Sequence, residues 1–293
     1  MVRRDWLEFV HEAQPARAAA RDVHVTTARR GRIPQRRIAE TVASELRTRI
    51  LSGDDDYRLP TQDQLVREFG VSYPSIRESL RILETEGLVT VRRGNVGGAE
   101  VHRPDESSAA YHLGLALQGA RVGLGDLAQA LQMLEPLCAA ECARRPDRAE
   151  VVVPALEANI AACDEVVGDG VEFTRTAREF HDLIVAFTPN ATVRCVVSSL
   201  VTLWSAQEQA WAETLSQRGE YPSQPQAHDA TRVHARLVTA IADGDDSEAE
   251  RLARAHLRAT QQVVLERYPS GFVNASSDLA RQAIAGGPRL PRP

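Results

Sequence analysis

The stretch Leu59–Val101, LPTQDQLVREFGVSYPSIRESLRILETEGLVTVRRGNVGGAEV, decides the fold of the first part of this chain. Apolar residues at helical spacing predict two short helices, and a Gly-Val-Ser turn at 70–72 joins them. Two β-prone segments, 88–91 and 99–102, follow and flank a glycine-rich turn that carries arginines. A winged helix-turn-helix has this layout, and it places one helix in the DNA major groove with a hairpin beside it. The stretch therefore predicts a DNA-binding domain.

The residues at the expected helix ends support these boundaries. Thr61 precedes Gln64 by three positions, which is the spacing of a capping box. Ser72 is placed to cap the second helix. Gly70 and Gly87 stand where a helix end favours a left-handed residue. A further helix is expected over 33–51, because its apolar residues also recur at helical spacing.

Beyond Pro104 the apolar pattern is helical throughout, without the alternation that strands require. Asn190 is placed to cap one of the helices, and Asp245 another. Helices are predicted near 124–145, 148–167, 171–187, 190–215, 226–242 and 246–267. The fold class is therefore mainly α, a winged helix-turn-helix followed by an all-helical bundle. We divide the chain into a basic flexible arm (1–32), a DNA-binding domain (33–103), a linker (104–123), a helical effector-binding and dimerisation domain (124–268) and a loose tail (269–293).

The charge of the chain is unevenly distributed. The formal net charge is −5. Through Arg103 there are 18 arginines against 15 acidic residues, whereas from Pro104 onward there are 17 against 25. A basic front and an acidic back suit a protein that presents only one end to phosphates.

Composition also indicates the compartment. No run approaches the ~18 consecutive apolar residues of a membrane span, and no apolar run follows the N-terminal arginines as in a signal peptide. We therefore expect a cytoplasmic protein without a membrane partner. The cysteines lack Cys-x-x-Cys spacing and lie in apolar helical stretches, so buried reduced thiols are expected at Cys138, Cys142, Cys163 and Cys195.

The DNA-binding end resembles the GntR family of bacterial transcription regulators. The resemblance spans roughly 34–103 and rests on Leu59-Pro60, Phe69-Gly70-Val71-Ser72, the run Ile76–Glu84 and Glu86-Gly87-Leu88-Val89. It implies that the recognition helix and the wing tip contact DNA. The candidate DNA-binding residues are Ser72, Tyr73, Ser75, Arg77, Arg81, Arg92, Arg93 and Gly94.

Two departures from the family pattern put the usual operator sequence in doubt. Gln62-Asp63 and Tyr73 stand where the family often has arginine. Arg77 and the wing arginines are then expected to carry more of the affinity, because an arginine bidentate to guanine contributes ~1–3 kcal/mol of discrimination. The alternative is that Arg77 and Arg81 are solvated helix arginines, paired with nearby carboxylates.

The helical end resembles the FCD ligand-sensing domain of the FadR branch of that family. The supporting segments are Leu134-Glu135-Pro136, Phe180–Ile184, Asn190, His234–Ile241, Gly244-Asp245 and Ala255-His256-Leu257. Many FCD domains hold a divalent metal with one Asp and three His. The matching histidines here are His181, His234 and His256, whereas the Asp position is Ala177. The resemblance implies a site for zinc or nickel that lacks its anionic ligand, and the alternative is three buried, hydrogen-bonded histidines without metal.

Together these features predict a ligand-responsive transcription regulator. We expect a homodimeric repressor that binds a near-palindromic operator of double-stranded DNA and senses a small-molecule carboxylate in its helical pocket. One alternative is a metal-free sensor of a more apolar effector such as an acyl thioester. A metal-dependent enzyme fused to a DNA-binding domain is a second, but no partnered nucleophile or base accompanies the histidines, so no catalytic residue is expected. An architectural DNA protein without effector is a third.

Overall fold

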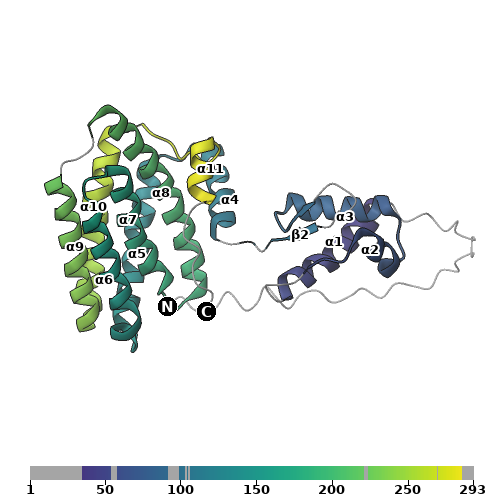
Figure 1. The fold of residues 1–293 in the computed structure, drawn as a ribbon, viewed down its shortest axis with the longest axis horizontal. Coiled ribbons are helices and arrows are strands. Elements are labelled where there is room, and N and C mark those ends of the chain that lie inside the picture. Colours follow the sequence, from purple (N-terminus) through teal and green to yellow (C-terminus); the bar gives the residue numbers. More distant parts are fainter. Residues whose placement is uncertain are drawn as a thin grey trace, which may run out of the picture.

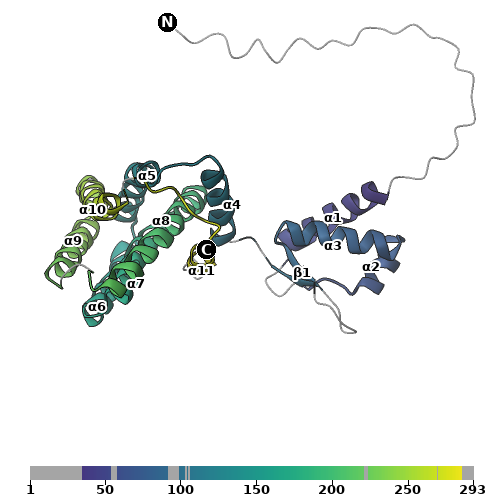
Figure 2. The ribbon, with the colours of Figure 1, turned by 90° about the horizontal axis from the view of Figure 1, so that it is seen from above.

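The computed structural model describes residues 35–53, 58–91, 99–102, 104, 106–220, 224–268 and 270–285. It contains a small winged-helix domain and a larger helical bundle, which Figures 1 and 2 show as two separate bodies. The predicted arm, 1–32, lies outside the described residues, as do Arg92, Arg93 and Gly94 of the expected wing tip.

The winged-helix domain has the predicted order of elements. It comprises α1 (Gln35–Ser52), α2 (Gln62–Phe69), α3 (Tyr73–Thr85), β1 (Val89–Val91) and β2 (Ala99–Val101). The strands pair antiparallel, with Val89 opposite Val101. The predicted capping box starts α2: the Thr61 side chain accepts from the Gln64 N–H, and the Thr61 N–H donates to Gln64 Oε1 at 2.8 Å. The three helices and β1 enclose one core of apolar side chains, formed by Val42, Leu46, Ile50, Leu65, Ile76, Leu80, Leu83, Leu88 and Val89.

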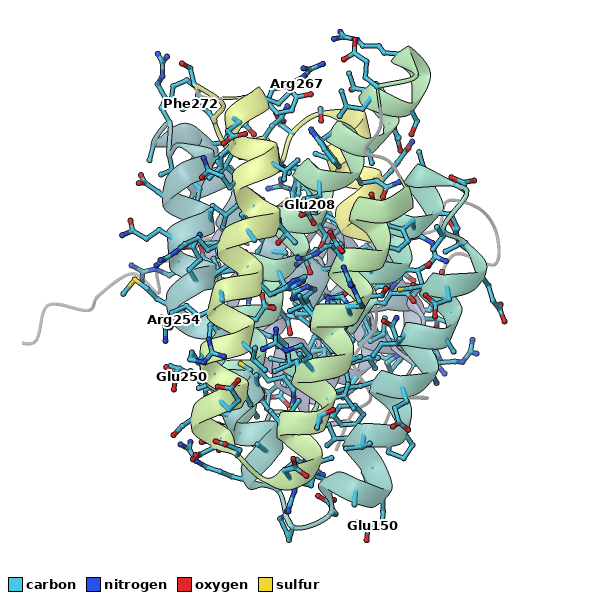
Figure 3. The ribbon with its side chains drawn as sticks, turned by 90° about the vertical axis from the view of Figure 1, so that its left-hand side faces the viewer. Glu150, Glu208, Glu250, Arg254, Arg267 and Phe272 are labelled. Atoms are coloured by element: carbon cyan, nitrogen blue, oxygen red, sulfur yellow. The ribbon has the colours of Figure 1, made fainter. Side chains whose placement is uncertain are left out.

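The bundle contains all six helices predicted beyond residue 124. They are α5 (Leu124–Arg144), a π-helical turn (Arg148–Val152) leading into α6 (Val153–Glu165), α7 (Gly170–Ala186), α8 (Ala191–Arg218), α9 (Gln224–Asp243) and α10 (Asp246–Arg267). Asn190 and Asp245 cap α8 and α10 through their side chains, as predicted. The core of the bundle includes Leu131, Leu156, Phe180, Ile184, Leu203, Trp204 and Leu237, all at most 1% exposed. Figure 3 shows Arg267 and Phe272 at one end of the bundle and Glu150 at the other.

The predicted linker is instead part of the bundle. Residues Glu106–Gly119 form α4, which packs against α8. This close packing depends on Gly114, because a Cβ there would lie 2.6 Å from both Ala275 Cβ and Leu203 Cδ2. Ala110 on the same helix is fully buried. The connection between the two domains is therefore much shorter than 104–123.

The predicted loose tail also folds onto the bundle over part of its length. Residues Asp278–Ala285 form α11, which packs on α8 and α4. The segment leading to it buries Val273 and Ala275. The side-chain oxygen of Gln118 accepts hydrogen bonds from the backbone N–H groups of Ala275 and Ser276, at 2.9 and 3.1 Å. Buried apolar side chains and paired backbone groups hold this segment in place.

The cysteines are all free thiols, but only three are buried. Cys138, Cys142 and Cys163 lie in the core. Cys195 is exposed, contrary to the expectation, because the first turns of α8 leave one side in solvent, where Val196 is 48% exposed. No helix within the described residues is long and apolar enough to cross a membrane.

Candidate DNA-binding face and ligand pocket

The recognition helix α3 presents two arginines to solvent. Arg77 and Arg81 are both exposed and line a hollow of about 360 Å³ with residues of α2 and β1. Arg81 makes two contacts to the Glu78 carboxylate, at 2.9 and 2.6 Å. Arg77 has no ion pair with any residue that the structure describes. The alternative of a paired helix arginine thus applies to Arg81, whereas the Arg77 guanidinium is available to an external acceptor.

Ser75 does not face outward as predicted. It is 2% exposed, and its hydroxyl lies 3.0 Å from that of Ser72. The reason is that Ser75 lies next to Ile76 on the inward side of α3, against the core of the domain. Ser72 is exposed and stands at the predicted N-cap position, although its side chain makes no capping hydrogen bond. Of these two serines, only Ser72 remains a candidate for DNA contact.

Two residues that depart from the family pattern, Tyr73 and Asp63, are joined by a hydrogen bond. The Tyr73 hydroxyl donates to the Asp63 carboxylate at 3.0 Å, and Tyr73 is 44% exposed. This hydrogen bond raises the pKa of Tyr73, and the nearby negative charge adds to the shift. A neutral hydroxyl and a carboxylate therefore occupy a surface where two cations were expected.

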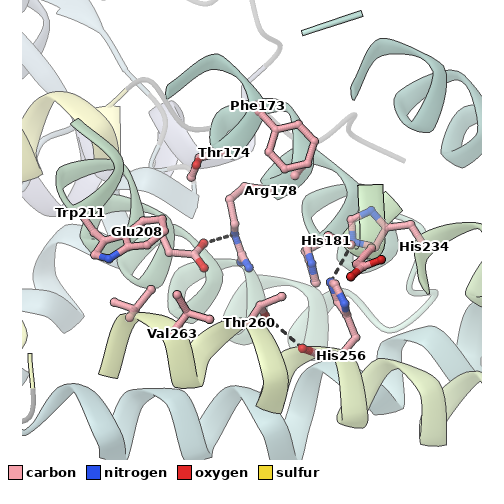
Figure 4. A pocket seen from close by; sticks show the side chains of 14 residues that line it. Phe173, Thr174, Arg178, His181, Glu208, Trp211, His234, His256, Thr260 and Val263 are labelled. Carbon is pink, nitrogen blue, oxygen red and sulfur yellow. Dashed lines mark hydrogen bonds and ion pairs between the residues drawn. The ribbon is translucent and has the colours of Figure 1, made fainter. Parts of the chain in front are cut away.

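A cavity of about 280 Å³ lies within the bundle and brings the three predicted histidines together. His181 comes from α7, His234 from α9 and His256 from α10 (Figure 4). Their potential ligand atoms all lie within 4.8 Å of one another, and the Nε2 atoms of His234 and His256 are 2.9 Å apart. Phe180 stacks on the His234 ring, with centroids 3.9 Å apart, and so fixes its plane. All three histidines are at most 5% exposed.

Burial keeps two of these imidazoles neutral at neutral pH. It lowers the pKa of His256 to about 3, with the charges of His181 and Arg178 acting in the same direction. It also lowers the pKa of His234 well below its usual value. Neutral imidazoles are the form that binds a metal ion, so these side chains need not lose a proton to do so.

Glu135 orients the third histidine. This α5 residue is 1% exposed, and its carboxylate contacts His181 Nδ1. Burial raises the pKa of Glu135, but the charge and hydrogen bond of His181 outweigh it, so the net shift is downward. With Nδ1 engaged, His181 has its Nε2 left for a ligand. Carboxylate partners of this kind commonly support metal-bound histidines. The sequence contained Glu135 only as part of a family motif, and nothing there indicated its contact with a residue 46 positions away.

The residues present fit a divalent metal ion. Three convergent imidazole nitrogens with one carboxylate behind them match a three-ligand zinc or nickel site that leaves a position for another ligand. Ala177 lines the same cavity, so the expected Asp position does face the histidines but supplies no ligand. Glu179 pairs with Arg175, and neither Glu179 nor Asp182 lines the cavity.

The same cavity contains a buried ion pair that sequence reasoning missed. Arg178 of α7 lies with its Nε 3.1 Å from Glu208 Oε2 of α8 and 3.2 Å from the Ser205 hydroxyl. Both charged side chains are less than 10% exposed. Arg178 Nη2 and Glu208 Oε2 nevertheless have no hydrogen-bond partner. The one available signal was an arginine three positions before His181, on the same side of a helix.

Comparisons with known proteins agree with this architecture. The sequence pattern of bacterial regulatory proteins of the gntR family matches residues 38–97, and that of the FCD domain matches residues 126–259. The chain is 26% identical over 239 residues to the HTH-type transcriptional repressor NanR of Klebsiella aerogenes, covering 79% of this chain and 86% of that relative. It is also 26% identical over 235 residues to the HTH-type transcriptional regulator Mce2R of Mycobacterium tuberculosis, covering 76% and 89%.

A solved structure shares the fold. Streptococcus agalactiae GntR aligns with a TM-score of 0.60 and 19% sequence identity, over 77% of this chain and 99% of that one. The gntR-family match lies over the winged-helix domain, and the FCD match lies over the histidine-lined bundle that follows it. The chain therefore belongs to the GntR family of bacterial regulatory proteins, as a DNA-binding transcriptional regulator whose second domain is an FCD domain.

Proposed function

We propose that this regulator is a repressor that acts in the cytoplasm as a homodimer on a near-palindromic operator. A twofold dimer presents two recognition helices to two half-sites, which is why such operators are near-palindromic. The name of the NanR relative, a transcriptional repressor, supports the sign of regulation. Arg77, Ser72 and Tyr73 are the proposed contacts from α3, with Arg81 able to exchange its pairing to Glu78 for a phosphate. The wing residues Arg92, Arg93 and Gly94 complete the proposed set.

The proposed effector is a small carboxylate that binds in the histidine-lined cavity. The observation that carries this proposal is the convergence of three buried histidines beside open space. We propose that His181, His234 and His256 hold zinc or nickel. The ion would supply positive charge where an effector carboxylate could coordinate.

The charges around the cavity explain why the ion matters for a carboxylate. His234 and His256 are neutral, and the charge of Arg178 is offset by Glu208 at 3.1 Å. Glu135 adds a negative charge behind His181. Asp229 also lines the cavity and adds a further carboxylate. The protein groups alone therefore offer an anion no net attraction, so affinity for a carboxylate should depend on the metal.

Metal analysis of the purified protein tests the proposed site. We expect near-stoichiometric zinc or nickel in the unaltered protein, and its loss after chelation and in His234→Ala. His112→Ala is the matched control, because His112 is exposed and distant in sequence from the three ligands. If the unaltered protein binds neither ion when supplied, Ala177 marks a lost metal site. The effector search should then turn to metal-free, more apolar compounds such as acyl thioesters.

Selection of bound fragments from random DNA tests the operator proposal. We expect an enriched near-palindrome, and a loss of about 1–3 kcal/mol in binding to it for Arg77→Ala. Arg218→Ala, at the end of α8 in the other domain, should bind normally. Unchanged affinity for Arg77→Ala would remove that residue from the recognition surface. Light scattering of the free protein and of the complex gives the number of subunits.

A further inference from the structure

The cavity offers a second polar site besides the histidines. Figure 4 shows Arg178 between the histidines on one side and Glu208 with Trp211 on the other. Apolar side chains of Phe173, Trp211, Val263 and Val264 form much of the remaining lining. The cavity therefore has buried charged or imidazole groups at two places, with hydrocarbon between them, and the exposed Asp229 also contributes to its lining. We call the pair Arg178 and Glu208 the ion-pair subsite.

The ion-pair subsite has one donor, Arg178 Nη2, without a hydrogen-bond partner, and one acceptor, Glu208 Oε2, that contacts Arg178 Nε at 3.1 Å but accepts no hydrogen bond. Arg178 Nη2 and Glu208 Oε2 are buried and make no hydrogen bond, although both residues line the cavity. A buried polar atom that makes no hydrogen bond carries an energetic cost, because it has lost its hydrogen bonds to water. The neighbouring Thr174 and Thr260 do not bond to these two atoms, and their hydroxyls each donate to a carbonyl of their own helix. A molecule that satisfied both atoms would recover this cost on binding.

The charges of the pair restrict which chemical group can do so. A second carboxylate would be repelled by Glu208, and an ammonium group would be repelled by Arg178. A methyl group would leave both polar atoms unpaired. A neutral group that accepts from the guanidinium and donates to the carboxylate satisfies both, and a primary carboxamide or a hydroxyl has this chemistry.

We propose that the ion-pair subsite recognises a neutral carboxamide or hydroxyl of the effector, whose carboxylate lies at the histidines. This inference rests on the proposed function and narrows it to a class of small acids with an uncharged polar far end. The cavity volume, at the lower end of the range for ligand pockets, limits the effector to a small molecule.

A series of straight-chain acids of matched length tests the proposal. The far end carries a carboxamide, a hydroxyl, a methyl, a second carboxylate or an ammonium group. Binding to the zinc- or nickel-loaded protein is measured by calorimetry, with the change in tryptophan fluorescence as a second readout because Trp211 lines the cavity. We expect the carboxamide or hydroxyl acid to bind at least tenfold more tightly than the methyl, dicarboxylate and ammonium acids. The better of the two neutral groups identifies the far end.

Two variants at the ion-pair subsite should change this preference in opposite ways. Glu208→Gln leaves the Arg178 charge without its partner, so the dicarboxylate should gain affinity at least tenfold relative to the carboxamide acid. Arg178→Met/Glu208→Leu removes both unpaired atoms, so the methyl acid should become the preferred ligand. Retained metal content and an unchanged circular dichroism spectrum establish that each variant is folded.

The binding results distinguish a failure of the ion-pair subsite from a failure of the proposed carboxylate-sensing function. If no acid binds and His234→Ala changes nothing, the proposed carboxylate-sensing function fails. If the acids bind in a His234-dependent way but show the same order in all three proteins, only the ion-pair subsite fails. A preference for the methyl or dicarboxylate acid in the unaltered protein would also overturn the proposal.

Discussion

The buried pair Arg178–Glu208 should show strong energetic coupling, with unequal costs for the two single substitutions. Its side chains are 8% and 9% exposed, with Nε and Oε2 3.1 Å apart. The perturbation is a double-mutant cycle of Arg178→Met, Glu208→Leu and the two together. Removing one partner from a buried ion pair leaves an uncompensated charge and costs about 3–5 kcal/mol. Replacing both by apolar side chains of similar size is close to neutral, so the coupling energy should be several kcal/mol.

The two single variants should differ, with Glu208→Leu the more destabilising. Arg178 would remain charged in the cavity, because a guanidinium does not lose its proton in a protein. In Arg178→Met the remaining carboxyl can take up a proton and so avoid a buried charge. For a helical domain of about 150 residues, 1 kcal/mol corresponds to about 2–4 °C in Tm. Glu208→Leu should therefore lower the Tm of the bundle by about 6–20 °C.

Urea unfolding followed by circular dichroism measures the cycle, and an exposed ion pair provides the control. Arg251 and Glu248 contact each other at 2.6 Å on α10, with side chains 61% and 36% exposed. The same substitutions there should change stability by at most about 1 kcal/mol. Additive effects at 178 and 208, or a larger cost for Arg178→Met than for Glu208→Leu, would refute the reasoning.

Three further predictions concern packing, capping and thiol exposure. Gly114→Ala should cost the bundle about 1–3 kcal/mol in denaturant unfolding, because its Cβ would meet that of Ala275 at 2.6 Å; Gly119→Ala, with nothing within 4 Å, should not. Thr61→Ala removes the capping box and should lower the stability of the winged-helix domain by about 1 kcal/mol, without moving the bundle transition in a thermal scan. Maleimide labelling of the native protein, read by mass spectrometry, should modify Cys195 first and the other three thiols only on unfolding; equal rates at all four would contradict the burial pattern.

Helix boundaries were predictable wherever local chemistry specifies them. The Thr61–Gln64 capping box and the Asn190 and Asp245 caps depend on residues at most three positions apart. The predicted glycines Gly70 and Gly87 both have positive φ and stand at the ends of α2 and α3. Such signals lie within one turn of a helix, so a single sequence contains them completely.

The two helices that were not predicted, α4 and α11, make contacts with residues that are distant in the sequence. α4 includes Gly114, a residue that lowers helix propensity, whereas α11 begins at a local cap that was not recognised, in which the Ala280 N–H donates to Ser277 Oγ at 3.1 Å. The stability of α4 comes from contact with α8 and α11, including the approach of Gly114 to Ala275, 161 positions away in the sequence. The segment before α11 is similar, because Gln118 of α4 accepts hydrogen bonds from the backbone N–H groups of Ala275 and Ser276. Tertiary contacts therefore contribute to the stability of both segments.

Some residues of the candidate site could likewise be predicted from the sequence, and others could not. The three histidines were found because the family resemblance places them, and the structure brings them together. Glu135 and Glu208 were not found, since each acts through a partner on another helix. The predicted exposure of Ser75 was wrong for a different reason. A position near the N-terminus of a recognition helix does not by itself determine whether the side chain faces the core or the solvent.

The arrangement of α7, α8 and α4 indicates how the cavity can influence DNA binding. The ion-pair subsite takes Arg178 from α7 and Glu208 from α8, so a ligand that bonds to both joins these helices. α8 also packs against α4, through Leu203 near Gly114. α4 follows β2 of the wing after only residues 102–105. A ligand shifts a conformational equilibrium only by its differential affinity for the two states. We therefore expect the effector to act through the placement of α8, and the α8–α4 contact to pass that change to the DNA-binding domain.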